Sequence, residues 1–229
     1  MPAYVAMYHD WDWAAAEREF QLAIALNPGY STTHQWYGNY LSLLGRFDES
    51  VTEFSRAIAL DPLSPLKNAA LGWAFYFARR YDLVVAQCSR ALELDPELAI
   101  AHAWLGLARE QQGPLPEAIA AFRQAVRFSD RNVGNLGGLA HALAVAGFGA
   151  EARALLAELT DLRAQRYVSA YDIALVHLAV GERAEAIGWL ERAFQERAHS
   201  VAFLRVDPRM DPLRSDQGFQ RLVGSLRLP

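Results

Sequence analysis

The segments LNPGY (residues 26–30), LDPLS (60–64) and LDPEL (94–98) place prolines at Pro28, Pro62 and Pro96, each 34 residues after the last. The next step of this period reaches Asp130 in RFSDRN (127–132), where the turn composition continues without a proline. Because proline disfavours a helical conformation at the residue before it, each of these prolines predicts the end of a helix. A fixed period of this length indicates a repeat protein.

The repeat register continues without insertion along most of the chain. Each unit contains two apolar runs with helical periodicity, and no stretch sustains the two-residue alternation of a half-buried strand. Glycine recurs just after the first run of a unit, at Gly45, Gly113, Gly147 and Gly181, where it suits the left-handed end of a helix. The five full units span residues 31–64, 65–98, 99–132, 133–166 and 167–200.

Residue size also follows the register. The eighth and twentieth places of a unit are mostly small, which would let two helices approach closely, and the twenty-fourth is mostly large, which would fill the space between them. The eighth places are Gly38, Gly72, Gly106, Ala140 and Ala174; the twentieth are Ser50, Val84, Ala118, Ala152 and Ala186; the twenty-fourth are Phe54, Cys88, Phe122, Leu156 and Leu190.

With alanine also common at the twenty-seventh place and proline at the thirty-second, residues 14–200 resemble the tetratricopeptide repeat family. The resemblance implies an all-α fold, in which antiparallel helix pairs stack into a right-handed superhelical solenoid. The family's tryptophan at the fourth place is absent, and the last three units lack the proline. Gly134, Gly137 and Gly138 fall within the first helix of the fourth unit, at a cost of about 1 kcal/mol each relative to alanine.

The two ends depart from the full units. Residues 1–30 fit a truncated first unit, in which Ala16, Phe20 and Pro28 keep the register. Residues 201–229 predict a C-terminal cap, with a short helix at about 215–226 that begins at the capping pair Ser215-Asp216. Its apolar face would seal the last unit, as the ends of solenoids require.

Composition excludes several classes of protein. With 52% hydrophobic residues, 11% aromatic residues and a net charge of -4, the chain is neither disordered by composition nor a nonspecific nucleic-acid binder. A single cysteine, Cys88, excludes an internal disulfide framework, and we expect it to be a buried, inert thiol. No run of 18 apolar residues predicts a membrane span, and no secretory signal opens the chain, so a cytoplasmic location is the default expectation.

We find no residue constellation for catalysis, and we expect no enzyme, cofactor or metal site. The sequence contains no G-x-S-x-G, phosphate-binding loop or dinucleotide-binding motif, and its six histidines show no compact metal-ligand spacing. Several carboxylates are expected at the solvent-facing starts of second helices, where they suit the helix dipole: Glu49, Glu53, Glu117, Glu151 and Glu185.

The resemblance further implies that the first helices of the units line a concave groove. This face is expected to be aromatic and nearly uncharged. We expect no clamp for a terminal carboxylate, because only Asn39 matches that pattern. An apolar peptide or helix is the predicted partner, because aromatic anchors favour such binding. The alternative interpretation is that these residues pack within the chain, against neighbouring helices or its own ends. The candidate groove residues are Trp36, Asn39, Trp73, Tyr76, Phe77, Trp104, Leu107, Glu110, His141 and Tyr171.

Two strings, HDWDWAAAEREF (9–20) and VDPRMDPLRSDQGFQRL (206–222), are similar to the C-terminal repeat regions of bacterial multidomain regulators. In those proteins the repeats follow a winged-helix DNA-binding domain, a serine/threonine kinase domain or a nucleotide cyclase domain. The leading hypothesis is a non-catalytic protein-interaction or scaffolding module of such a regulator. The alternatives are a homo-oligomerisation module, with Trp11 and Trp13 near the interface, and a domain that senses a small molecule.

Overall fold

The computed structural model describes residues 2–229, and within this range the chain is helical without any strand. Short or irregular helices occur at both ends of the chain. The elements are α1 (Pro2–Val5), η1 (Ala6–Asp10), α2 (Trp13–Leu26), α3 (Ser31–Leu43), α4 (Phe47–Leu60), α5 (Pro65–Phe77), α6 (Tyr81–Leu94), α7 (Ala99–Gln112), α8 (Leu115–Phe128), α9 (Val133–Val145), α10 (Gly149–Arg163), α11 (Ala170–Ala179), α12 (Arg183–Gln195), η2 (His199–Phe203), η3 (Pro208–Leu213) and α13 (Gln217–Ser225).

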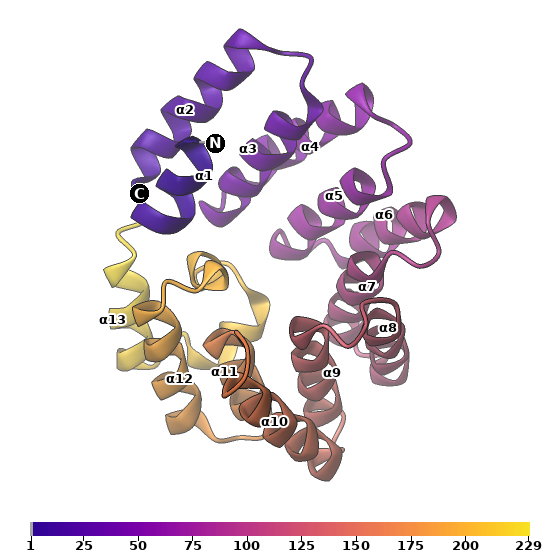
Figure 1. Cartoon of the computed structure of the whole chain (residues 1–229), viewed down its shortest axis with the longest axis vertical. Helices are drawn as coiled ribbons and strands as arrows, with labels where there is room; N and C mark the ends of the chain where they lie inside the picture. The colour runs from indigo at the N-terminus through magenta and orange to yellow at the C-terminus, as the bar shows by residue number, and fades with distance from the viewer. Residues whose placement is uncertain (1) are drawn as a thin grey trace.

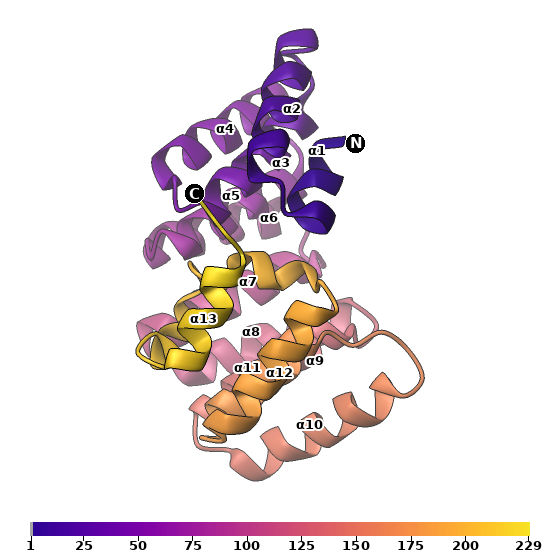
Figure 2. The same cartoon turned by 90° about the vertical axis from the view of Figure 1, so that its left-hand side faces the viewer.

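Consecutive helices pair antiparallel and stack into a right-handed superhelix, as the sequence predicts (Figure 1). The array curves so far that the C-terminal helix α13 returns to the first helices (Figure 1). The final residues run from α13 toward α2 and α3 (Figure 2). Three hydrogen bonds join the two ends of the array. The Trp13 indole N–H donates to the Leu226 carbonyl at 2.9 Å, Arg205 donates to the Leu44 carbonyl at 2.7 Å, and Arg197 donates to the His9 carbonyl. The solenoid is therefore closed on itself.

Glycine at the eighth place permits the close helix contacts within a pair. A Cβ atom added to Gly38 would lie 2.7 Å from the Phe54 ring, and one added to Gly106 would lie 2.8 Å from the Phe122 ring. Such distances are far below van der Waals contact, so any side chain at these positions would push the paired helices apart. The small residue at the eighth place and the large residue at the twenty-fourth thus pack directly against each other.

The place after the first helix of each pair holds a residue in the left-handed conformation. Gly45, Gly113, Gly147 and Gly181 have φ between 77° and 106°, as expected for helix-terminating glycines. In the second unit the same place is occupied by Arg79, with φ 60°. A residue with a long side chain is uncommon in this conformation. Its presence here indicates that a contact of the side chain offsets the backbone preference.

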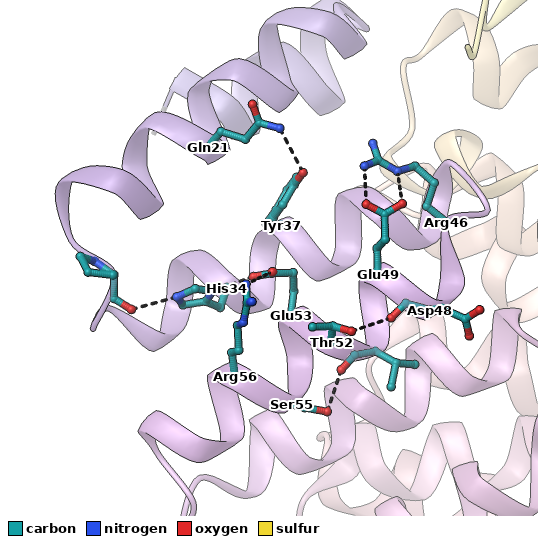
Figure 3. A network of polar contacts seen from close by, with 12 residues as sticks. Gln21, His34, Tyr37, Arg46, Asp48, Glu49, Thr52, Glu53, Ser55 and Arg56 are labelled. Atoms are coloured by element: carbon teal, nitrogen blue, oxygen red, sulfur yellow. Dashed lines mark hydrogen bonds and ion pairs between the residues drawn. The ribbon is translucent and has the colours of Figure 1, made fainter.

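Polar contacts join α2, α3 and α4 at the start of the array (Figure 3). The His34 ring lies between the Pro28 carbonyl oxygen, at 2.9 Å, and Glu53 Oε2, at 2.6 Å. Arg56 also donates to Glu53, at 2.6 Å. The expected solvent-facing position of Glu53 is wrong, because the residue is only 7% exposed. It lies half-way along α4, on the face packed against α3, where His34 and Arg56 satisfy its carboxylate.

Candidate functional site

A cavity of about 340 Å³ lies on the inner face of the array. Three tryptophans from successive first helices contribute to its wall: Trp36 of α3, Trp73 of α5 and Trp104 of α7. We call this cavity the tryptophan pocket. Its other lining residues are Tyr8, Gln35, Asn39, Leu66, Ala70, Ile100, Tyr171, His199, Ser200, Phe203, Asp207 and Arg209.

The three indole rings are held in place by other aromatic rings. Trp73 and Trp104 stack with centroids 5.3 Å apart and planes 18° apart, and Trp36 packs edge-on against Tyr4 at 5.3 Å. All three tryptophans remain half-buried, and Leu66 beside them is 46% exposed. The register predicted these three residues on one face, and the structure brings them to one pocket.

Residues 199–213, which we call the closing segment, cross the inner face next to this pocket. They comprise η2, η3 and the turn between them. The Phe203 ring stacks on Phe77 with centroids 4.9 Å apart and contacts Trp73 edge-on at 5.9 Å. Phe77 is consequently 2% exposed, and its neighbour Tyr76 is completely buried. In this conformation both candidate residues contact the chain's own C-terminal part.

A buried ion pair anchors the closing segment. Asp207 is 1% exposed and accepts hydrogen bonds from Arg209 Nη2 at 2.6 Å and from the Tyr171 hydroxyl at 2.7 Å. The Tyr76 hydroxyl lies 3.5 Å from its other oxygen. Burial by itself would raise the pKa of Asp207, but the Arg209 guanidinium and the hydrogen bonds outweigh it and hold that pKa below its ordinary value. Asp207 is therefore a carboxylate at neutral pH, fixed between α5 and α11.

A second buried pair lies further along the inner face. His141 Nδ1 of α9 and Glu110 Oε2 of α7 are 3.0 Å apart, and both residues are nearly inaccessible to solvent. Leu107, one turn before Glu110, is likewise buried. The expectation of a nearly uncharged face is thus wrong. Glu110 and His141 were among the candidate groove residues, whereas Asp207 and Arg209 come from the closing segment and not from the repeats.

Asp172 of α11 is the remaining carboxylate of this region. It is half-buried, and it packs so closely on α9 that a Cβ atom added to Gly137 would lie 3.0 Å from its own Cβ. Burial raises the pKa of Asp172 to about 6, with an opposing contribution from Arg209 and a further increase from Asp207.

Replacing Asp172 with asparagine is therefore expected to stabilise the protein at pH 7.5 by about 1–2 kcal/mol, since one pKa unit corresponds to about 1.4 kcal/mol and the site is only partly buried. The folded pKa is raised, so the folded state binds the proton more tightly, and the wild type loses stability as the pH rises from about 4 through 6. Urea unfolding at pH 4, 6 and 7.5 measures the effect. A gain of equal size at all three pH values would contradict this origin.

The two tryptophans proposed for a self-association edge contact the C-terminal part of the same chain. Trp13 is 5% exposed and bonds the Leu226 carbonyl. Trp11 packs on Phe194, with centroids 4.8 Å apart, and the Arg197 guanidinium lies 4.8 Å above its ring. Both residues thereby close the solenoid. Their role in self-association stays a prediction, which light scattering over a concentration series would test.

Sequence reasoning missed the residues that complete the site, namely Tyr8, His199, Phe203, Asp207 and Arg209. In the sequence, Asp207-Pro208 resembles an ordinary turn. A signal was present in the second unit, where arginine stands at the place that glycine holds in four others.

Residues 2–229 hold neither a cluster of metal ligands nor a helix that could span a membrane. In this part of the chain no three histidine, cysteine, aspartate or glutamate side chains are grouped to hold a metal ion. None of its helices is both long and apolar enough to cross a bilayer. Burial raises the pKa of the Cys88 thiol to about 12, which leaves it protonated and unreactive at neutral pH.

Comparison with known proteins identifies the repeats. Tetratricopeptide repeat family models match residues 31–62 and 69–132. A tetratricopeptide repeat protein from Parabacteroides merdae superposes with a TM-score of 0.69 at 12% identity, covering 98% of this chain and 81% of its own. The type IV pilus biogenesis factor PilW gives 0.64 at 20% identity, over 92% of this chain and 94% of its own. A Thermus thermophilus tetratricopeptide repeat protein gives 0.61 at 18% identity, over 87% and 100%.

No curated protein matches the sequence. Tetratricopeptide repeat models thus match part of the chain, and the solved structures share its fold, a helical solenoid.

Proposed function

We propose that this chain is a non-catalytic protein-interaction module that binds a partner segment on its inner face, by insertion of an apolar side chain into the tryptophan pocket. The observation that carries the proposal is the set of three half-buried indoles around a cavity of about 340 Å³. Tryptophan is enriched among the residues that dominate binding energy at protein interfaces. The tetratricopeptide repeat fold is itself one that mediates protein–protein interaction.

The geometry restricts how such a partner would bind. Of the predicted groove residues, Trp36, Asn39, Trp73 and Trp104 line the pocket and keep exposed surface, whereas Tyr76 and Phe77 lie beneath the closing segment. A partner of the closed form therefore uses one anchor side chain and the rim around Leu66, which is 46% exposed. An extended helix laid along the whole inner face would require the closing segment to leave.

A peptide selection tests this proposal. Random twelve-residue peptides selected on the immobilised chain should carry an aromatic or large aliphatic anchor. Their affinity should fall at least 10-fold, about 1.4 kcal/mol or more, in Trp36→Ala, because the variant removes one wall of the pocket.

Trp189→Ala is the matched control for that experiment. Trp189 is also a half-buried tryptophan, but it lies on α12 between Arg163 and Arg192, away from the pocket. Equal losses of affinity in both variants, or selected peptides that ignore Trp36, would refute the proposal.

The finer proposal is that the module serves a bacterial multidomain regulator as its sensory or scaffolding part. It rests on the similarity of residues 9–20 and 206–222 to the repeat regions of such proteins. The complete reading frame of the gene tests it, since a kinase, cyclase or winged-helix domain joined to these repeats is the expected finding. A frame that codes for these repeats without any output domain would reject the regulator role.

A small-molecule sensor is a second candidate, which the size of the pocket favours. Its volume falls in the lower range of ligand pockets, and the amides of Gln35 and Asn39 at its wall could orient a ligand. A thermal-shift screen of apolar and aromatic metabolites distinguishes the two. A compound that stabilises the wild type but not Trp36→Ala would support the sensor, whereas stabilisation by selected peptides alone would support the interaction module.

A further inference from the structure

The closing segment has two faces with different partners. Val201, Leu204 and Met210 are fully buried in the core formed with α11, α12 and α13. Ala202, Phe203 and Val206 belong instead to the core of the preceding repeats. The first face holds the segment on the C-terminal cap, and the second face lies in the groove as a bound peptide would.

The contacts of the second face are those of a recognised ligand. The Phe203 ring contacts both Phe77 and Trp73, and four residues later the Asp207 carboxylate meets the Tyr76 and Tyr171 hydroxyls. An aromatic anchor and a buried, hydrogen-bonded charge are typical of the centre of an interface. The groove therefore already contains one occupant, which is part of the same chain.

Arg79 supplies an independent indication that closure is a specific interaction. It occupies a place that glycine holds in four other units, and it keeps the left-handed conformation there with φ 60°. Its guanidinium forms two hydrogen bonds of 2.7 Å with the carboxylate of Asp211, in the closing segment. Arg131, Arg197 and Arg227 adopt the same left-handed conformation, so the two bonds to Asp211, and not the backbone, are what link Arg79 to the closing segment.

We infer that residues 202–207 are an intramolecular ligand of the groove, and that a partner segment carrying an aromatic residue followed four positions later by a carboxylate competes for the same surface. This inference rests on the proposed function, because it adds a second subsite to the tryptophan pocket. In the closed form the partner has access to the pocket alone. Release of the segment adds the surface of Trp73, Tyr76 and Phe77, so the same chain offers a short and a long binding site.

The test uses a fluorescein-labelled synthetic peptide of residues 199–210, which lacks Asp211 and so does not depend on Arg79. Fluorescence anisotropy measures its binding to the full wild-type chain and to Arg79→Gly. Glycine restores the residue found in the other units and removes the bond to Asp211, so the repeat should stay folded while the closing segment is weakened. We expect the Arg79→Gly chain to bind the peptide at least 5-fold more tightly than the wild type.

Arg80→Ala is the matched control, because Arg80 has similar exposure and forms a surface ion pair with Asp48 at 2.8 Å, away from the closing segment. Its affinity for the peptide should equal that of the wild type. A peptide with Asp207→Asn should lose the gain seen in Arg79→Gly, since it no longer offers a carboxylate to the Tyr171 hydroxyl, while the chain's own segment is unchanged. Equal peptide affinity in the wild type and Arg79→Gly would overturn the inference.

Hydrogen exchange provides a second measurement that needs no foreign peptide. Amides of residues 199–213 should exchange through local opening, at least 5-fold faster in Arg79→Gly than in the wild type, while α11 is unchanged. If the segment exchanged only on global unfolding in both chains, it would be a permanent cap and the inference would fail. The proposed function would survive that result as long as the selected peptides still lost affinity in Trp36→Ala. Conversely, if the peptides bound Trp36→Ala as well as the wild type, the proposed function would fail while local opening of the segment would still support the closure.

Discussion

Replacing Asp207 with alanine is expected to lower the free energy of unfolding by about 3–5 kcal/mol, the largest effect of any substitution considered for this chain. The Asp207 side chain is 2% exposed and that of its partner Arg209 is 11% exposed. Removal of the carboxylate leaves a buried guanidinium without its counter-charge, and also leaves the Tyr171 hydroxyl without its acceptor. Urea unfolding at pH 7, followed by circular dichroism, measures the loss.

The double variant Asp207→Ala/Arg209→Met is the control for this interpretation. Because it removes both charges, it should recover a large part of the stability lost in the single variant. The pKa of Asp207 is lowered in the folded state, so the contribution of the carboxylate is present above its ordinary pKa of about 4 and is lost as the pH falls through the folded value. A loss below about 1 kcal/mol at pH 7, or a double variant no better than the single one, would refute a structural role for the pair.

Gly138→Ala is expected to destabilise the protein by about 1–3 kcal/mol, although alanine is the better helix former by about 1 kcal/mol. Gly138 lies within α9, where a Cβ atom would overlap the edge of the Phe122 ring, with the ring Cδ1 at 2.9 Å. The ring is 2% exposed and is held by the α7–α8 pair, so it has little room to move. Thermal or urea unfolding measures the loss.

Gly188→Ala reverses the sign and serves as the control. Gly188 is exposed within α12, and a Cβ atom added there would meet no atom within 4 Å. Helix propensity alone then acts, and a gain of about 0.5–1 kcal/mol is expected. Two stabilising substitutions, or two destabilising ones of equal size, would show that the Phe122 contact is not what requires glycine at position 138.

The repeats could be predicted from sequence because their contacts are local and periodic. Pro62 and Pro96 lie just beyond the ends of α4 and α6, and Gly38 faces Phe54 within one pair as the register requires. The sequence showed only that the glycines of α9 lower helix propensity. It could not show why they are needed, because Phe122 and Asp172, which leave no room for a Cβ atom there, lie on other elements. Trp36, Trp73 and Trp104, which the family resemblance assigns to the concave face, line one pocket.

The position of the closing segment across the inner face could not be predicted from local, periodic contacts. Tyr76 and Asp207 are separated by 131 residues, and no periodic pattern relates them. Asp-Pro pairs satisfy local turn preferences equally well whether the aspartate is exposed or buried. The two termini met for the same reason: the total curvature of the stacked pairs, which brings Trp13 to Leu226, accumulates over the whole array and is not encoded in any single unit.

The closure of the array also changes its cooperativity. In an open solenoid each terminal repeat has one neighbour, so unfolding can begin at either end and spread inward one unit at a time. Here the bond from Trp13 to the Leu226 carbonyl and the contact of Trp11 with Phe194 give the first and last units a second neighbour. Apart from the closing segment, which can open locally, the first and last units are then held on both sides and cannot fray independently. The chain should accordingly behave as one all-or-none folding unit, even though its sequence is a row of repeats.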